Sequence, residues 1–259
     1  MDRSGVEEKE GTAMRGAQTL MRGLDILDHV IDGPVKVSEL ARELDLTKST
    51  AHRLAQALRT RGYLAMTADG YSLGPKLLQL GMVVNEQTDF VRIARPHMET
   101  LSSETGYCVF IGKREGDWSR HLERVTGRQR LRVATAPGDS RFITDTGLGK
   151  ALLLDVGHEE LGQLRRKAKP HADEREMEAW LAALDVHRAR GAVLHDSEAG
   201  DGVRSVAAPV RDARGKIVIA LSIAGASVYL TDEVMAGLVG AVRATAAAIS
   251  ADLGYVADR

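Results

Sequence analysis

Apolar residues recur at helical spacing near the start of the chain. One stripe is spaced by four, three and four residues: Leu20, Leu24, Leu27 and Ile31. It predicts an amphipathic helix over residues 18–31, which Gly33 and Pro34 end. Residues 1–16 are charged, contain glycine and lack an apolar run. They are therefore predicted to be a disordered tail and not a secretory signal.

Two shorter helices follow, joined by the turn LDLT. Ser38 is the expected N-cap of the first, and Glu39 is favourably placed in its first turn. Thr47 is the expected N-cap of the second, which Gly62 ends. The predicted inward residues of that second helix are Ala51, Leu54, Ala55 and Leu58.

A hairpin and a linker complete the N-terminal part. Asp69 and Gly70 separate two short β-prone runs, which predicts a tight antiparallel turn. Three helices and a two-stranded ribbon together predict a winged helix-turn-helix domain over residues 17–74. Residues 75–89 are predicted to form a linker helix whose apolar stripe suits a dimer seam. That stripe is Leu77, Leu80, Gly81 and Val84.

Residues 90–259 mix strands with helices and predict a second domain. A helix over 91–105 precedes two β-prone runs around Gly116, which predict an antiparallel pair. Further helices are predicted at 147–155, 159–167, 173–190 and 231–253, and further strands at 191–195, 203–210 and 216–224. This order predicts an α+β domain built around an antiparallel sheet.

The last two predicted strands alternate large and small residues. In the final strand the side chains of one face are large: Ile217, Ile219, Leu221 and Ile223. Those of the other face are small: Val218, Ala220, Ser222 and Ala224. In the preceding strand Ser205 and Ala207 lie on one face, and Val206 and Ala208 lie on the other. The small face suits close helix packing or a cavity with sparse hydrogen-bonding groups, and the pattern alone leaves both open.

Composition narrows the class of protein. The chain has 259 residues and a net charge of -1, so it is no polycation that would coat DNA or lipid indiscriminately. Cys108 is the only cysteine, which excludes an internal disulfide and a Cys-rich zinc site. No stretch approaches the roughly 18 apolar residues needed to span a bilayer. We expect a cytoplasmic protein without a membrane partner.

One stretch departs from this near neutrality. LTKSTAHRLAQALRTRGYL, residues 46–64, contains no acid, whereas a merely solvated face usually mixes both signs of charge. Short polar residues at a helix N-terminus suit base edges and phosphates, and later cations suit the backbone. The stretch predicts contacts to double-stranded operator DNA from Thr47, Lys48, Ser49, Thr50, His52, Arg53 and Arg59.

Three motifs resemble the IclR family of bacterial transcription regulators. VSELARELDLTKSTAHRLAQALRTRGYL, continued by YSLGPKLLQLG, resembles the DNA-binding half of that family. TGLGKALL and EAGDGVRSVAAPVRDARGKIVIALSIAG resemble the two signatures of its effector-binding domain. The resemblance implies a GAF-like sensor domain, a homodimer or dimer of dimers, and a repressor or activator controlled by a small metabolite, often an organic acid or aromatic compound.

The resemblance also implies which residues line an effector-binding pocket. The implied positions are Leu131, Gly147, Leu148, Asp196, Glu198, Val203, Ser205, Ser222 and Ala224. Family members often carry a hydroxyl where Ala224 stands, so the resemblance names no particular ligand. The start of the helix at Gly147 to Gly149 is expected to offer N–H groups to a carboxylate.

Other chemistries find little support in the residues. TDTGLGKA departs from the phosphate-binding loop, since Thr144 replaces its first glycine and Ala151 replaces the hydroxyl that Mg²⁺ needs. HEEL lacks the second histidine of a zinc-protease motif, and Cys108 lies in an apolar run typical of a core. We expect no cofactor, metal or catalytic residue. Two alternatives remain: an enzyme or sensor joined to a DNA-binding domain, and a DNA-binding protein without a ligand.

Overall fold

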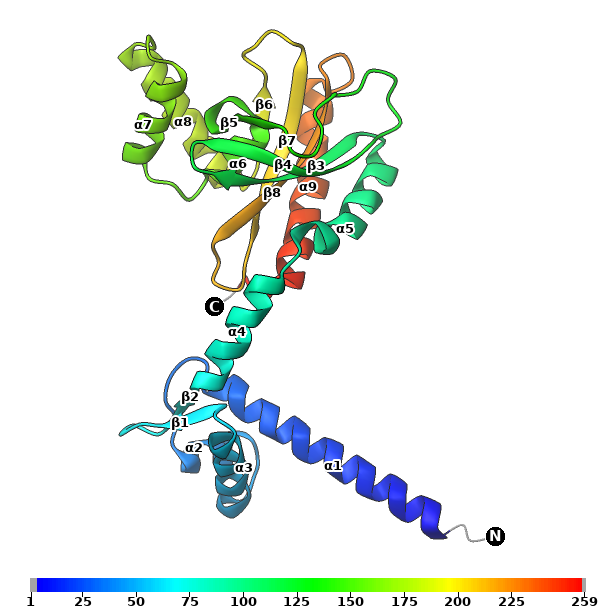
Figure 1. The fold of residues 1–259 in the computed structure, drawn as a ribbon, viewed down its shortest axis with the longest axis vertical. Coiled ribbons are helices and arrows are strands. Elements are labelled where there is room, and N and C mark those ends of the chain that lie inside the picture. The colour runs from blue at the N-terminus through cyan, green and yellow to red at the C-terminus, as the bar shows by residue number, and fades with distance from the viewer. Residues whose placement is uncertain (1–3, 258–259) are drawn as a thin grey trace. The chain divides into compact units, whose positions relative to one another are not determined.

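A computed structural model of the chain describes residues 4–257, with the backbone alone for residues 4–16 and 85–87. Contacts divide the chain into two compact units, Met1–Thr88 and Asp89–Arg259. Each unit is considered by itself, and Figure 1 labels their elements. The predicted fold class is confirmed, because helices and a hairpin make up the first unit and an α+β arrangement the second.

The first unit has the order of a winged helix-turn-helix. Its elements are α1 (Ser4–His29), α2 (Val37–Glu43), α3 (Lys48–Thr60), β1 (Leu64–Met66), β2 (Tyr71–Leu73) and α4 (Pro75–Gln87). β1 and β2 form the predicted antiparallel hairpin, with Leu64 opposite Leu73. One hydrophobic cluster joins α1, α2, α3 and the hairpin and includes Ile26, Leu40 and Ala51.

Two local predictions differ from the structure. α2 begins at Val37 with Lys36 as its N-cap, because the Glu39 carboxylate accepts the Lys36 backbone N–H at 3.1 Å; Ser38 is not the cap. α1 begins at Ser4, so its backbone includes most of the segment 1–16 that the sequence predicts to be a disordered tail. The segment contains no proline and is rich in helix formers. Residues 1–3 lie outside the described part.

Only part of the predicted stripe of α1 faces the core. Leu27 packs against the hydrophobic cluster, whereas Leu20 is 64% exposed and Leu24 is 45% exposed. Among the residues of α1 whose burial the structure describes, Gly23 and Ile26 are buried, and Val30, just after the helix, is buried too. The helix carries apolar residues on two faces, and periodicity does not tell which of them meets the core. α1 therefore keeps an exposed apolar face.

The second unit is a six-stranded antiparallel sheet with helices on both faces, in the strand order β5-β4-β3-β8-β7-β6. Its strands are β3 (Cys108–Glu115), β4 (Trp118–Val125), β5 (Ser140–Phe142), β6 (Val193–Asp196), β7 (Val203–Arg211) and β8 (Ile217–Ala226). Its helices are α5 (Phe90–Thr105), η1 (Ile143–Asp145), α6 (Gly147–Leu152), α7 (His158–Ala168), α8 (Glu174–Arg190) and α9 (Asp232–Asp252). The short elements β5 and η1 were not predicted.

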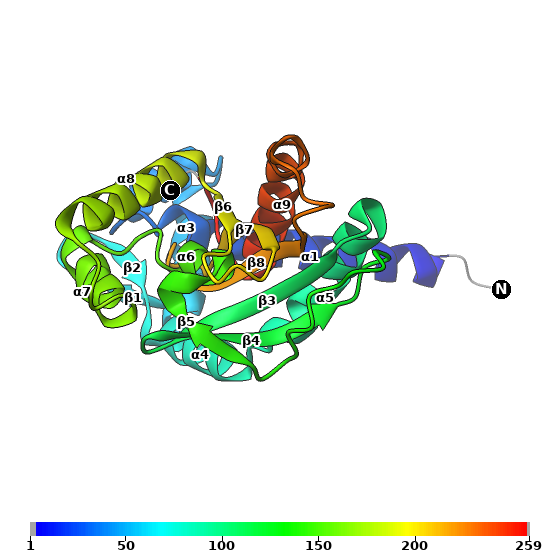
Figure 2. The ribbon, with the colours of Figure 1, turned by 90° about the horizontal axis from the view of Figure 1, so that it is seen from above.

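The alternation predicted for the last strands is confirmed in the packing. Ile219, Leu221 and Ile223 belong to one core cluster with residues of α5 and α9. Ala207 and Ala220 belong to the cluster on the other face, beneath α6. Figure 2 shows α9 on one side of the sheet and α6 and α8 on the other. Ile217 is an exception, since it packs against the second cluster, beside a register shift between Val210 and Arg211.

α9 corrects one expectation from composition. An 18-residue window of this helix has a mean hydropathy of 1.6, so by length and composition it is apolar enough to cross a membrane. Much of this hydropathy comes from alanine, so a pattern of large apolar residues does not reveal it. In the structure Val242, Ala246 and Ile249 of α9 are buried in the core cluster that it shares with α5, and 28% of the window is buried.

Candidate functional sites

Local structure exposes the face of α3 that is predicted to contact DNA. Asp45 adopts a left-handed conformation (φ 49°), which Asp tolerates better than most residues, and the chain turns there from α2 into α3. Thr47 is the N-cap of α3, as predicted, and its hydroxyl accepts the N–H of Thr50 at 3.2 Å. Ala51 and Ala55 are buried on the inner side. The opposite side is exposed at Lys48, Ser49, His52, Arg53 and Arg59, and Thr50 is half-buried.

The cations on this face are not neutralised within their own unit. The ion pairs described in the first unit join Glu43 with His29 and with Arg42. Lys48, Arg53 and Arg59 have no acidic partner among the residues that the structure describes. Exposed cations without a partner are available to phosphate oxygens.

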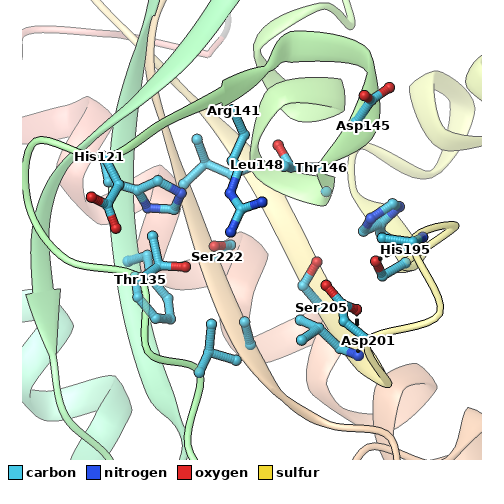
Figure 3. Close-up of a pocket in the computed structure, with 18 of the residues that line it drawn as sticks. His121, Thr135, Arg141, Asp145, Thr146, Leu148, His195, Asp201, Ser205 and Ser222 are labelled. Atoms are coloured by element: carbon cyan, nitrogen blue, oxygen red, sulfur yellow. Dashed lines mark hydrogen bonds between the residues drawn. The ribbon is translucent and has the colours of Figure 1, made fainter. Parts of the chain in front are cut away.

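A cavity of about 750 Å³ lies in the second unit, beside the small-residue face of the sheet (Figure 3). Its wall includes six of the nine positions implied for an effector: Gly147, Leu148, Val203, Ser205, Ser222 and Ala224. Antiparallel register places Ser205 opposite Ala224 and Ala207 opposite Ser222. The two serine hydroxyls therefore reach the cavity from neighbouring strands.

Part of the small-residue face packs against a helix and does not line the cavity. Ala207 and Ala220 are fully buried and pack with Leu148 and Leu152 of α6. Both interpretations of the alternating pattern thus apply, each to a different stretch of the same strands. Helix packing covers these two alanines, and the cavity begins at Ser205, Ser222 and Ala224.

The other three implied positions do not line this cavity. Leu131 is 58% exposed. Asp196 pairs with Arg204 at 3.1 Å, and the Glu198 carboxylate accepts a hydrogen bond from Arg165 at 2.9 Å. Glu198 lines a second cavity, of about 600 Å³, together with residues of α7 and α8. These two acids are therefore engaged by arginines and do not line the cavity beside the small-residue face.

The start of α6 is held tightly against the strands. A Cβ added at Gly147 would lie 2.3 Å from the Ser205 hydroxyl and 2.9 Å from the His195 Cβ. The Thr146 hydroxyl accepts the N–H of Gly149 at 2.9 Å. One of the N–H groups expected to face a carboxylate is thus already used by the cap.

The cavity wall also contains groups that sequence analysis did not single out. They include Phe110, Trp118, His121, Arg132, Thr135, Asp139, Arg141, Asp145, His195 and Asp201. Several lie on β5 or on the irregular segment between β4 and β5, where no periodic pattern marks which side chains turn inward. Two ring pairs flank the cavity edge to face: Phe110 with His121 at 5.5 Å and Trp118 with Phe142 at 5.6 Å between centroids.

Two buried titratable groups, Lys150 and His195, lie close together at this wall. Lys150 Nζ is 3.3 Å from His195 Nδ1 and 3.8 Å from a Glu198 carboxylate oxygen. Burial lowers the pKa of Lys150, and Glu198 opposes that shift. Burial, with Lys150 as the next cause, lowers the pKa of His195 to about 4. The His195 ring is therefore neutral at neutral pH and accepts a hydrogen bond from Lys150. Among the side chains that the structure describes, residues 17–84 and 88–257, no three His, Cys, Asp or Glu lie close enough together to hold a metal ion.

Two family models match the chain along most of its length. The IclR helix-turn-helix domain matches residues 19–67, and the bacterial transcriptional regulator IclR C-terminal domain matches residues 82–251. The chain belongs to the IclR family. The first IclR model covers α2 and α3, and the second covers the cavity described above.

IclR-family relatives of known name are transcriptional regulators. The DNA-binding transcriptional repressor YiaJ of Escherichia coli (strain K12) is 30% identical, over 96% of this chain and 92% of its own. The glycerol operon regulatory protein of Streptomyces coelicolor is 31% identical, over 93% of this chain and 98% of its own. The crystal structure of the repressor BlcR of Agrobacterium tumefaciens has a TM-score of 0.75 at 28% identity, covering 93% of this chain and 98% of its own. This IclR-family chain is thus a transcriptional regulator with a DNA-binding helix-turn-helix domain.

Proposed function

We propose that this IclR-family regulator binds a specific operator through α3 and that a small metabolite, an organic acid or an aromatic compound, controls that binding. The observation that carries the proposal is the cavity of about 750 Å³ in the second unit, in a chain whose first unit exposes unpaired cations on α3. The metabolite cavity and the DNA-binding face belong to different compact units. Substitutions in one are therefore expected to leave the other folded.

The first experiment tests the recognition helix. Arg53→Ala and Lys48→Ala remove exposed cations that have no acidic partner among the described residues. Each is expected to weaken operator binding, and the loss of one phosphate contact should reduce the salt slope of the binding constant by about one unit. The measurement is a titration of operator DNA at several salt concentrations.

A matched variant separates local contacts from overall charge. Arg175→Ala removes an equal charge from the exposed surface of α8, in the other unit, and is expected to leave operator affinity unchanged. If the Arg53 and Lys48 double variant bound operator as tightly as the parent chain, α3 would not lie in the major groove.

The second experiment tests the cavity. A thermal-shift screen of metabolites would identify compounds that stabilise the folded chain. Ser222→Leu deletes a hydroxyl from the cavity wall and fills space beside it. It is expected to abolish the effect of such a compound, while operator binding without the compound persists. Ser103→Leu, at an exposed position of α5, is the control.

Calorimetry and operator titration on the same folded variant decide the outcome. Unchanged metabolite affinity in Ser222→Leu would place the metabolite outside this cavity. Loss of both activities in a folded variant would contradict the assignment of sensing and DNA binding to separate units. Chemical turnover of the stabilising compound would instead favour the enzyme alternative, and an open cavity argues against a protein without a ligand.

We further propose that the regulator acts as a homodimer, or a dimer of dimers, because one recognition helix covers only half of an operator. Apolar residues on two helices of the first unit support this. Leu20 of α1 and Leu78, Leu80 and Val84 of α4 are between 41% and 70% exposed. Exposed apolar faces of this extent mark contacts with a partner.

Light scattering tests the oligomeric state directly. Leu80→Glu combined with Val84→Glu places two charges on one face of α4 and is expected to dissociate the dimer and weaken operator binding. Gln79→Glu adds a charge at a neighbouring exposed position and serves as the control. A monomeric parent chain with an asymmetric single half-site in footprinting would contradict the proposal.

A further inference from the structure

Arg141 is an exposed cation of the cavity wall. It lies on β5, and its guanidinium points toward the middle of the cavity (Figure 3). The hydrogen bond described for this residue involves its backbone carbonyl, which accepts from the Ser119 hydroxyl at 3.2 Å. Within the described part of the chain, no acceptor lies within hydrogen-bond or ion-pair distance of the guanidinium. A guanidinium presents a planar fork of donors that matches the two oxygens of a carboxylate.

The acids of the cavity wall have partners of their own. The Asp139 carboxylate accepts the N–H of Ala136 at 2.8 Å, and that of Asp201 accepts the N–H of Val203 at 3.1 Å. Asp145 accepts a hydrogen bond from the Thr144 hydroxyl at 2.9 Å and also lies 3.6 Å from Arg165. None of these carboxylates forms an ion pair with Arg141 within the described part of the chain, although, against the opposing effect of burial, the charge of Arg141 helps to lower the pKa of Asp201.

His121 is a second polar group of this wall without a partner. It is 8% exposed, and its Nδ1 is buried without a hydrogen bond to any described residue. Burial lowers the pKa of His121, Asp139 opposes the shift, and Arg141 adds to it. The ring is therefore neutral at neutral pH, with one nitrogen that donates and one that accepts. A buried polar atom without a partner is costly to the fold, which favours a role in binding.

Aromatic residues gather around the same end of the cavity. The whole chain contains three Phe and two Trp, and Phe110, Phe142 and Trp118 line this cavity. Phe110 packs edge to face with His121, and Trp118 with Phe142. Such surfaces favour a planar ring as the apolar part of the ligand.

We propose that the effector is a small aromatic carboxylate whose carboxylate binds Arg141 and whose ring lies against Phe110 and His121. The hydroxyl of Ser222, which is paired with Phe110 across β8 and β3, and that of Ser205 on the neighbouring strand β7 then meet polar substituents of the ring. The inference rests on the proposed function, because it assigns the chemistry of the same cavity. A monoanion fits better than phosphate, since the wall holds three Asp against the two cations Arg132 and Arg141 and so does not favour a second negative charge.

The test uses calorimetry on the full chain with benzoates, phenylacetates and cinnamates as probes. Their primary amides keep the shape without the charge, whereas acetate, succinate and inorganic phosphate carry charge without the ring. At least one aromatic carboxylate is expected to bind, and its amide is not. Arg141→Met should lower the affinity for that probe by about 10- to 150-fold, because it removes one hydrogen-bonded charge pair.

Arg130→Met is the matched control, because Arg130 is an exposed arginine of the segment between β4 and β5 and does not line the cavity. Its affinity for the probe should equal that of the parent chain, and the melting temperature of Arg141→Met without probe should be unchanged. Equal binding of carboxylate and amide, unaltered binding by Arg141→Met, or binding of aliphatic acids or phosphate alone would overturn the inference. A neutral metabolite lost only in Ser222→Leu would overturn it too, yet leave the proposed function standing.

Discussion

Gly147 provides a sharp test of how α6 packs against the two strands beneath it. Replacing it with alanine adds a Cβ that would lie 2.3 Å from Ser205 Oγ and 2.9 Å from His195 Cβ. The serine hydroxyl can rotate away from the new methyl group. The His195 Cβ is attached directly to the backbone of β6, so α6 or β6 must move to accommodate the change.

The expected cost is that of overpacking a closely packed core, about 1–3 kcal/mol of the free energy of unfolding. For a unit of the size of Asp89–Arg259, each kcal/mol corresponds to roughly 2–4 °C in melting temperature. The transition of this unit is therefore expected to fall by about 2–12 °C. Displacement of Ser205 and His195 should also weaken binding of any ligand in the cavity, because both line it.

Gly162→Ala is the matched control with the opposite expected sign. Gly162 lies inside α7, and no atom stands within 4 Å of an added Cβ. Alanine there should stabilise the unit by about 0.5–1 kcal/mol, since glycine is the poorer helix former. Thermal and urea unfolding followed by circular dichroism measure both variants. If Gly147→Ala were as stable as the parent chain, α6 would not approach Ser205 and His195 as closely as described.

Two further predictions concern the cap of α3 and the response to acid. Thr47→Ala removes the hydroxyl that accepts the N–H of Thr50, so the first unit should lose about 1 kcal/mol in thermal unfolding, and Thr47→Ser should retain most of it; equal stability of the Ala and Ser variants would refute the cap. The pKa of His195 is about 4 in the folded chain against 6.5 for the free side chain, so the unfolded chain binds the extra proton between these values. Its contribution to stability is complete above pH 6.5 and declines by about 1.4 kcal/mol per pH unit as the pH falls toward 4. Urea unfolding at several pH values from 7 to 4.5 measures the free energy of unfolding of the parent chain and of His195→Gln. The fall of this free energy with pH should be less steep in His195→Gln by that amount. An equally steep fall in the two proteins would contradict the lowered pKa of His195.

The sequence by itself determined the features that depend on neighbouring residues. The cap at Thr47, the exposed polar face of α3 and the hairpin at Gly70 all follow from residues within a few positions of one another. The division of β8 into a large and a small face also follows from local alternation. Periodicity and capping report these features because they act over one or two turns of helix or a few residues of strand.

Only the tertiary structure decided what depends on contacts between distant segments. It buried Ile26 of α1 and left Leu20 and Leu24 of the predicted stripe exposed, a choice that the sequence did not make. It directed the Glu198 carboxylate to Arg165 and brought Arg141 and His121, more than eighty residues before Ser222 in the chain, into one cavity with that serine. Which polar side chain faces a cavity is set by the pairing and packing of several strands at once, and no pattern within a single segment carries that information.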